Sequence, residues 1–341
     1  MITRTSLLRA RALCFLPTSI AVLALPILTF AQSTINPTAP PISPVNPPMS
    51  GTLIENDREA LYARFNDYRR NPNPEQQRFA YPLAKEFLRA WGGENTPEVK
   101  EVRTWLTEHE RQVHQNALYA AYEAKDYAKV FTQGRQIVKD DPEFFFGLAI
   151  ITEAGYDNSV AGSKNLNAET GEYARQAIAL LETGKVTNPD PFKNMDLARS
   201  FLNYALATMV REEAPAEAAS AYSKALKSPG NPYSQNPLAY HRLGTAIYKG
   251  QLAPLSNEYN EKFGGKQSSA EQTAMMYKLV KLSDQAIDAY ARAVALMDKP
   301  EQKNARAQAL AQLTTLYKAF HNNSDDGLNE LIAGVLSKPM P

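Results

Sequence analysis

The chain has 341 residues, of which 44% are hydrophobic and 21% charged, and its formal net charge is +1. This composition is typical of a folded protein that is long enough to bury a core. The near-neutral charge and the lack of a basic run or stripe argue against a nucleic-acid partner. No window alternates apolar and polar residues over a useful length, which predicts an all-α fold.

The first 31 residues have the order of features of an export signal. Three arginines precede an apolar run from Ala12 to Ala31, and a small residue ends that run at a cleavage position. The run approaches the ~20 residues that span a bilayer, so an uncleaved membrane anchor is the alternative. Pro17 and Pro26 disfavour a stable membrane helix. We therefore predict an exported protein, periplasmic or secreted, whose signal peptide (1–31) is cleaved after Ala31 and which contacts a membrane only if it is not.

Cys14 is the only cysteine, and it lies inside the apolar run. Cleavage would leave a mature chain without cysteine, which excludes disulfides, thiolate nucleophiles and thiolate metal ligands. Residues 32–54 follow as a linker in which six prolines fall between positions 35 and 48. We predict that this linker is disordered and extended, because proline-rich segments favour polyproline II geometry.

Residues 55–110 are predicted to form an N-terminal helical cap. Its first helix ends at the Asn-Pro-Asn-Pro turn of 71–74, and its second is expected to kink at Pro82 and to end at Trp91. A third helix is expected to open at Thr96–Pro97, with threonine as the cap and proline at the first helical position. Aromatic and apolar residues at three- and four-residue spacing predict that these helices share one small core.

Residues 111–338 carry helical periodicity with two distinctive faces. In two stretches, 217–226 and 285–294, alanine, tyrosine and alanine recur at spacings of four and three. That spacing stacks a small, an aromatic and a small side chain on one helical face, against which a neighbouring helix can pack closely. Two segments rich in loop-forming residues, near 155–167 and 250–268, are predicted to be insertions. The second is expected to end at a capping box formed by Ser268 and Glu271, followed by one long helix that reaches Met297.

These stretches resemble the second helix of a tetratricopeptide repeat. The segment 238–250 resembles the first helix of such a repeat, with Tyr240 as its large aromatic residue and Leu243–Gly244 as its leucine–glycine pair. The resemblance covers roughly 112–338 with degenerate repeats. It implies a right-handed α–α superhelix, a solenoid of about five to six helix pairs.

The resemblance also implies a partner-binding groove lined by the first helix of each pair. Tyrosine, asparagine and arginine at such positions suit the recognition of a protein or peptide. Each of these side chains could instead simply face solvent. The chain does not reproduce the lysine, asparagine and arginine set that clamps a terminal carboxylate in some members. The groove positions carried over from the family are Gln115, Tyr119, Tyr122, Asn203, Arg211, His241, Tyr248 and Lys249.

A search for catalytic or metal-binding motifs gives no candidate. His109 and His114 are five residues apart, which places their rings about 140° apart around a helix, so they cannot share a zinc ion. Phosphate-binding loops, dinucleotide fingerprints and nucleophile elbows are missing from the sequence. Asp284 and Asp288 lie one helical turn apart without a histidine or serine to complete a site. We predict no catalytic residue, no metal site and no cofactor.

These observations favour an exported, non-enzymatic scaffold that mediates protein–protein interaction in the cell envelope. One alternative is a glycan- or cell-wall-binding module, in which exposed tyrosines would stack on sugars. Another is an envelope hydrolase or its accessory subunit. The hydrolase would need a pocket that holds two carboxylates, or a carboxylate and His241.

Overall fold

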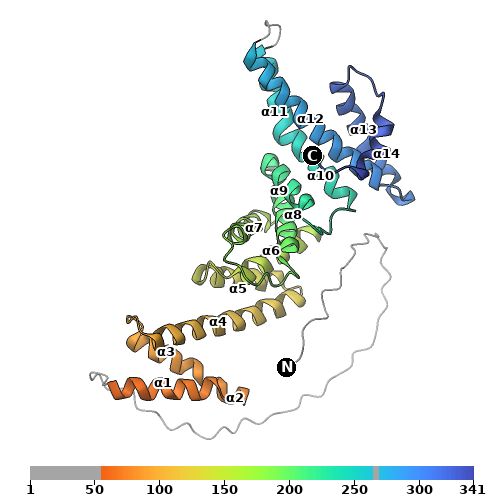
Figure 1. The fold of residues 1–341 in the computed structure, drawn as a ribbon. Helices are drawn as coiled ribbons and strands as arrows, with labels where there is room; N and C mark the ends of the chain where they lie inside the picture. The colour runs from red at the N-terminus through yellow and green to blue at the C-terminus, as the bar shows by residue number, and fades with distance from the viewer. Residues whose placement is uncertain (1–54, 264–268) are drawn as a thin grey trace, which may run out of the picture. The chain divides into compact units, whose positions relative to one another are not determined.

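The computed structural model describes residues 55–263 and 269–341 (Figure 1). These residues form helices joined by short connections, and no strand occurs among them, so the described chain is all-α. None of the described helices has the length and apolar character needed to cross a membrane. The predicted signal peptide and the proline-rich linker lie outside the described residues.

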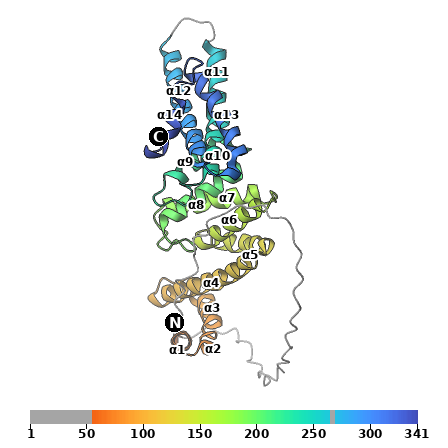
Figure 2. The same cartoon turned by 90° about the vertical axis from the view of Figure 1, so that its right-hand side faces the viewer.

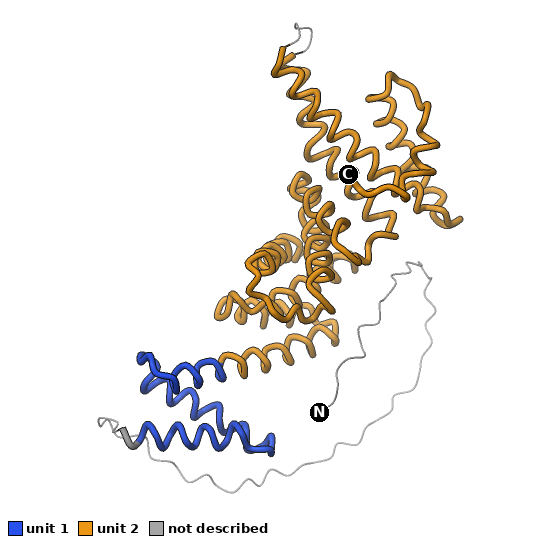
Figure 3. Tube along the Cα trace, viewed as in Figure 1, with its two compact units in different colours: residues 1–106 blue, residues 107–341 orange. Residues whose placement is uncertain are grey.

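The chain divides into two compact units, residues 1–106 and residues 107–341 (Figure 3). Helix α4 (Pro97–Glu123) runs through the division, four residues before the end predicted for the helical cap at residue 110. In unit 1, α4 is preceded by α1 (Glu55–Arg69), the short α2 (Pro74–Gln77) and α3 (Ala80–Trp91).

The core of unit 1 is built from aromatic and apolar side chains on α1, α3 and α4. Phe65, Phe87 and Val102 are fully buried, and Trp105 packs edge-on against Phe65 with ring centroids 5.1 Å apart. The helix predicted to kink at Pro82 is divided in the structure, because α2 ends at Gln77 and α3 begins at Ala80. Pro82 lies just after this break, in α3. It is the third residue of the helix, and the N–H groups of the first turn have no acceptor within the helix, so the missing donor costs nothing there.

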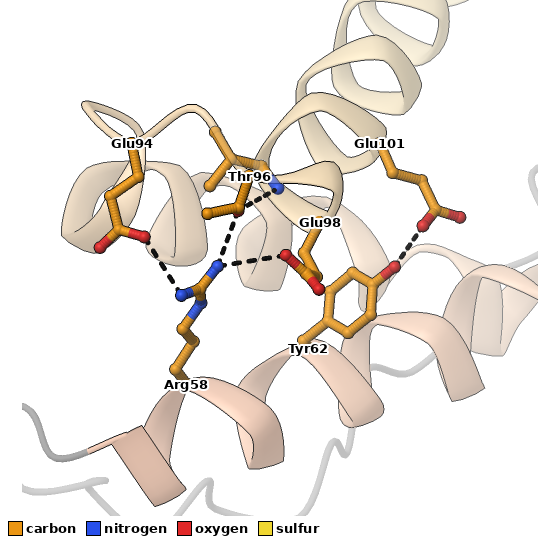
Figure 4. Close-up of polar contacts among 7 residues, drawn as sticks. Arg58, Tyr62, Glu94, Thr96, Glu98 and Glu101 are labelled. Atoms are coloured by element: carbon orange, nitrogen blue, oxygen red, sulfur yellow. Dashed lines mark hydrogen bonds and ion pairs between the residues drawn. The ribbon is translucent and has the colours of Figure 1, made fainter.

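Arg58 of α1 contacts the turn between α3 and α4 (Figure 4). Its guanidinium donates to Thr96 Oγ1 at 2.7 Å and pairs with Glu98 at 3.2 Å and Glu94 at 3.1 Å. Thr96 Oγ1 also accepts the backbone N–H of Val99 at 3.4 Å. The cap predicted at Thr96–Pro97 is therefore confirmed, and Arg58 stabilises its hydroxyl.

A second polar contact of unit 1 lies one turn further along α4. Glu101 accepts hydrogen bonds from the Tyr62 hydroxyl and from the Arg69 guanidinium. The hydrogen bond from Tyr62 is the largest of the effects that lower the pKa of Glu101, followed by the one from Arg69. The carboxylate is therefore held in its ionised form.

Unit 2 is a series of helices in which each packs chiefly on the next along the chain (Figures 1 and 2). Sequential contacts run from α5 to α10, after which α12 packs on both α10 and α13. The elements that follow α4 are α5 (Tyr127–Asp140), α6 (Phe145–Val160), α7 (Asn167–Glu182), α8 (Met195–Val210), α9 (Pro215–Lys227), α10 (Pro237–Ile247), the π-helix η1 (Tyr248–Leu252), α11 (Ala253–Phe263), α12 (Ala270–Leu296), the 3-10 turn η2 (Pro300–Gln302), α13 (Lys303–Phe320), α14 (Leu328–Gly334) and the 3-10 turn η3 (Val335–Ser337).

The small–aromatic–small faces predicted in the second half of the chain are buried. Tyr222 is fully buried between α8 and α9, and Tyr290 is 4% exposed between α10 and α12. A Cβ atom at Gly244 of α10 would lie 3.0 Å from the Tyr290 ring. The leucine–glycine pair of α10 therefore lets α12 approach closely enough to lay its tyrosine on the α10 backbone.

The two segments predicted as insertions are largely helical. Residues 155–160 complete α6, and only 161–166 connect it to α7; residues 250–263 belong to η1 and α11. Gly155 and Gly250 are glycines because another element lies against them. A Cβ at Gly155 would lie 1.9 Å from Thr170 Oγ1, and one at Gly250 would lie 2.3 Å from the backbone N of Ala216.

The second segment therefore lengthens a helix pair rather than interrupting it. α11 and α12 contact each other along the hairpin that they form (Figure 2). Ser269, not Ser268, caps α12 by accepting the N–H of Gln272 at 3.1 Å. Ser268 itself lies outside the described residues.

Ion pairs join the odd-numbered helices α5, α7 and α9 in a repeating pattern. Arg135 of α5 forms two 2.7 Å contacts with Glu169 of α7, and Arg175 of α7 contacts Glu217 of α9 at 2.7 and 2.8 Å. Each arginine is the ninth residue of its helix and each glutamate the third. These two ion pairs, which we call the Arg–Glu joints, are thus made by equivalent positions of α5, α7 and α9.

Candidate functional site

The most distinctive polar feature of unit 2 is a set of carboxylates and tyrosines that we call the tyrosine–carboxylate cluster. Helix α6 contributes Glu153, Tyr156 and Asp157, whose spacing of three and four residues places them on one helical face. The other members are Tyr122 at the end of α4, Tyr204 in α8 and Tyr233 in the connection between α9 and α10.

Helix α6 is built so that this face is its only acidic part. From Phe145 to Gly155 almost every side chain is buried, which fixes the orientation of the helix in the core. Glu153 interrupts that buried run and Asp157 follows one turn later, and both keep partial exposure to solvent. The Tyr122 hydroxyl donates a 2.9 Å hydrogen bond to Asp157 Oδ2, which ties the end of α4 to α6.

Glu153 is held in an unfavourable setting for a charge. Burial is the main cause that raises its pKa to about 8, and the nearby negative charge of Asp157 adds to the effect. Within the described residues, Glu153 forms no hydrogen bond or ion pair. A carboxyl group of this kind exchanges its proton near neutral pH instead of staying ionised.

The tyrosines of the cluster pack against one another. Tyr204 and Tyr233 stack with ring centroids 3.9 Å apart and planes 12° apart, and Tyr156 meets Tyr204 edge-on at 6.1 Å. Burial is the largest cause that raises the pKa of each of these phenols, and the charge of Glu153 contributes to raising that of Tyr233. They therefore remain neutral hydrogen-bonding groups well above physiological pH.

Two further side chains position these rings. Asn231 donates to the carbonyls of Leu226 and Ser228, and its Oδ1 accepts the backbone N–H of Tyr233 at 3.1 Å, which orders the connection that carries Tyr233. On the other side, Arg242 of α10 donates to the Tyr204 hydroxyl at 3.3 Å. The cluster therefore draws on α4, α6, α8 and the connection before α10, and Arg242 of α10 contacts it.

The groove residues predicted from the sequence are distributed over several places. Tyr122 belongs to the cluster, and Arg211 is close enough to Tyr204 for its charge to lower the pKa of that phenol. Gln115 is half-buried on α4, and Tyr119, on the same helix, is 43% exposed.

The remaining predicted residues lie away from the cluster. His241 contacts Gln312 Oε1 through Nε2 at 2.7 Å and the Tyr290 ring at 5.5 Å, so it faces α12 and α13. Tyr248 and Lys249 are exposed on the π-helix. Asn203 donates to the carbonyl of Arg199 and lines a separate cavity.

That cavity has a volume of about 640 Å³ and lies among α7, α8, α9, α10, α12 and the C-terminus. Arg199, Lys224 and Lys227 give it a basic rim. Met340 and Pro341 line it as well, so the last residues of the chain form part of its wall. No member of the tyrosine–carboxylate cluster contributes to this cavity.

Five members of the site escaped the sequence analysis. The available signal was in α6, where Glu153 follows eight residues without a charge and precedes Asp157 by one turn. An acid placed within a buried run needs an explanation. The glycine and polar residues after Gly155 predicted a loop, so Glu153 was not recognised as part of a buried helix. The members that were not predicted are Glu153, Tyr156, Asp157, Tyr204 and Tyr233, together with their neighbour Arg242.

The described residues contain no group of three or more histidine, cysteine, aspartate or glutamate side chains arranged to hold a metal ion. The chemistry within reach of the cluster is hydrogen bonding by neutral phenols, ring stacking, and the binding or release of a proton or cation at a largely desolvated carboxylate. No protein-family model, curated protein sequence or solved structure matches this chain.

Proposed function

We propose that this chain is an exported, non-enzymatic scaffold of the tetratricopeptide type, which forms a right-handed superhelix and binds a protein partner in the cell envelope. The sequential packing of helices supports a repeat architecture. The two Arg–Glu joints add a second line of support, because they use the same helix positions in successive helix pairs. Export rests on the order of features in residues 1–31.

The tyrosine–carboxylate cluster is the observation that carries the binding proposal. Five of its six members come from α4, α6 and α8, the first helices of successive pairs, which line the ligand groove in a solenoid of this type. Tyrosine supplies contact area at a low entropy cost, and a partly exposed carboxylate without a partner supplies specificity. We therefore place the partner-binding surface at this cluster rather than at the exposed residues of η1.

A photo-crosslinking amino acid at Val160 tests this proposal. Val160 is 43% exposed and lies one turn beyond Tyr156 and Asp157 on α6. The expected result is one discrete crosslinked protein in the envelope fraction of cells that make the chain natively. Thr132, exposed on α5, is the matched control position and should give no such product.

Two outcomes would refute the proposal. Equal crosslinking from positions 160 and 132 would mean that the cluster is not the contact surface. Crosslinks to cell-wall glycan alone would replace a protein partner with the glycan-binding alternative.

A hydrolase is a second candidate, and one observation favours it. Glu153 and Asp157 are two neighbouring carboxyl groups, and the pKa of Glu153 is raised to about 8, as in enzymes that pair a general acid with a carboxylate. Release of soluble fragments from purified cell-wall polysaccharide would support this function if Glu153→Gln abolished the release. No release by the wild-type protein would exclude it for that substrate.

A further inference from the structure

Glu153 lacks a countercharge within the described residues. Burial leaves this carboxyl group largely desolvated, yet no arginine or lysine of the described residues pairs with it. Ionised groups in such settings are normally paired, because an unpaired charge out of water is costly. The ionised form of Glu153 therefore has no partner among the described residues, and a cation would supply one.

The arginine that contacts the tyrosines of the cluster is already engaged. Arg242 donates to the Tyr204 hydroxyl, and its charge lowers the pKa values of Tyr156 and Tyr204. Only burial and Asp157 shift the pKa of Glu153, and both raise it. Arg242 thus supports the tyrosine stack without neutralising the carboxyl group.

The aromatic rings make the same site favourable for a positive charge. The negative charge of Glu153 contributes to raising the pKa values of Tyr122 and Tyr233, which places both phenols close to it. Tyrosine ring faces attract ammonium and guanidinium groups, and a neighbouring carboxylate adds a charge-assisted hydrogen bond. Tyr122 is itself tied to Asp157, so the site is ordered before any ligand arrives.

We propose that the tyrosine–carboxylate cluster binds the cationic side chain of an arginine or lysine of the partner protein, with Glu153 as its counterion. This inference rests on the proposed scaffold function and specifies the chemistry of the partner. A cation at this position turns a costly carboxylate into a paired one, and the neighbouring tyrosine rings add a cation–π attraction.

The proposal requires that ligand binding releases a proton. At pH 7 Glu153 is mostly protonated, and a cationic ligand binds its ionised form, so close to one proton should leave on binding. The affinity should rise up to roughly a hundredfold between pH 6 and 9, where Glu153 ionises in the free protein. The ionisable groups of the cluster and its neighbours are Asp157 and Tyr156 on α6, Tyr122 on α4, Tyr127 on α5, Tyr204 on α8, Tyr233 before α10, and Arg242 on α10.

The test compares two peptides that differ in one charge. The probes are acetyl-Ser-Gly-Arg-Gly-Ser-amide and the same peptide with neutral citrulline in place of arginine. Affinity is measured by NMR titration of the tyrosine ring resonances, and proton release by calorimetry in two buffers of different ionisation enthalpy. The wild-type protein should bind the arginine peptide at least about tenfold more tightly, which is the scale of one paired charge.

Two variants complete the test. Glu153→Gln keeps the shape of the side chain and should remove both the preference for arginine and the proton release. Glu261→Gln, at an exposed position of α11, makes the same change in net charge and should leave both unchanged. Equal affinity for the two peptides, or proton release that persists in Glu153→Gln, would overturn the inference. The crosslink from Val160 would survive that result, so failure of the cationic ligand and failure of the scaffold proposal are distinguishable.

Discussion

Replacing Glu153 with glutamine should stabilise the protein at alkaline pH and leave it nearly unchanged at pH 5. The pKa of this carboxyl group moves from 4.5 to about 8 on folding, so the folded state holds the proton more tightly than the unfolded chain. Stability contributed by such a group is present below pH 4.5 and is lost as the pH rises toward 8. At 1.36 kcal/mol per pKa unit, the shift sets an upper bound of roughly 4–5 kcal/mol at pH 9.

Glutamine carries no charge at any of these pH values, so it does not incur this loss. The difference in thermal midpoint between variant and wild type should grow from a small value at pH 5 to as much as about 8–20 °C at pH 9, at roughly 2–4 °C per kcal/mol for a protein of this size. Thermal unfolding followed by circular dichroism at pH 5, 6, 7, 8 and 9 measures it. Because other titrating groups are common to both proteins, their contributions cancel in the difference.

A companion substitution separates the two causes of the raised pKa. Asp157→Asn removes the neighbouring charge but leaves the burial of Glu153, which is the larger cause. More than half of the pH dependence should therefore persist in Asp157→Asn. A stability difference between Glu153→Gln and wild type that is constant with pH, or that is greatest at pH 5, would refute the electrostatic argument.

Three further predictions concern packing and ion pairs. Gly244→Ala places a methyl group 3.0 Å from the Tyr290 ring and should destabilise the protein by about 1–3 kcal/mol in urea unfolding. A loss below ~0.5 kcal/mol would mean that the ring can move away freely. A double-mutant cycle on Arg175 and Glu217 should give a coupling of about 0.5–1 kcal/mol that weakens in high salt, and zero coupling would mean that the joint is only geometric. Deleting residues 338–341 removes two carbonyl acceptors from Arg292, which is 5% exposed. The free energy of unfolding in the same assay should fall by about 1–3 kcal/mol. An unchanged midpoint would show that water replaces the two carbonyl groups.

Glycines explain where the sequence interpretation went wrong about the fold. Helix periodicity was sufficient to predict an all-α chain and the buried faces around Tyr222 and Tyr290. Gly155 and Gly250 were interpreted as loop signals, because glycine more often marks a turn than a contact. Both lie inside helices and are small because Thr170 and the α9 backbone occupy the space of a side chain. The partner of such a contact is distant in sequence, so local composition cannot reveal it.

Prolines were easier to interpret once their position within a helix was known. Pro97 begins α4 as predicted. Pro82 lies in the first turn of α3, which begins two residues before it at Ala80. Pro254 is the second residue of α11, directly after the π-helix η1 and Ala253, so it too lies in a first turn. A shift of two residues in a helix start thus decides whether a proline kinks a helix or is tolerated. Sequence patterns do not fix helix starts that finely.

The candidate site was only partly within reach of the sequence because burial, not residue type, gives it its chemistry. Tyr122 was predicted, from family resemblance, as one of several groove positions. The uncharged run before Glu153 was the one sequence signal that distinguished it from the solvated acids of other helices, and the glycine and polar residues that follow it predicted a loop instead. The chemistry of Glu153 becomes distinctive only because the fold buries it near Tyr122 of α4 and Tyr233 of the connection before α10. An acid that the fold desolvates without pairing is stable only in its protonated form or beside a cation, and this requirement links the stability of the protein to the ligand that it can bind.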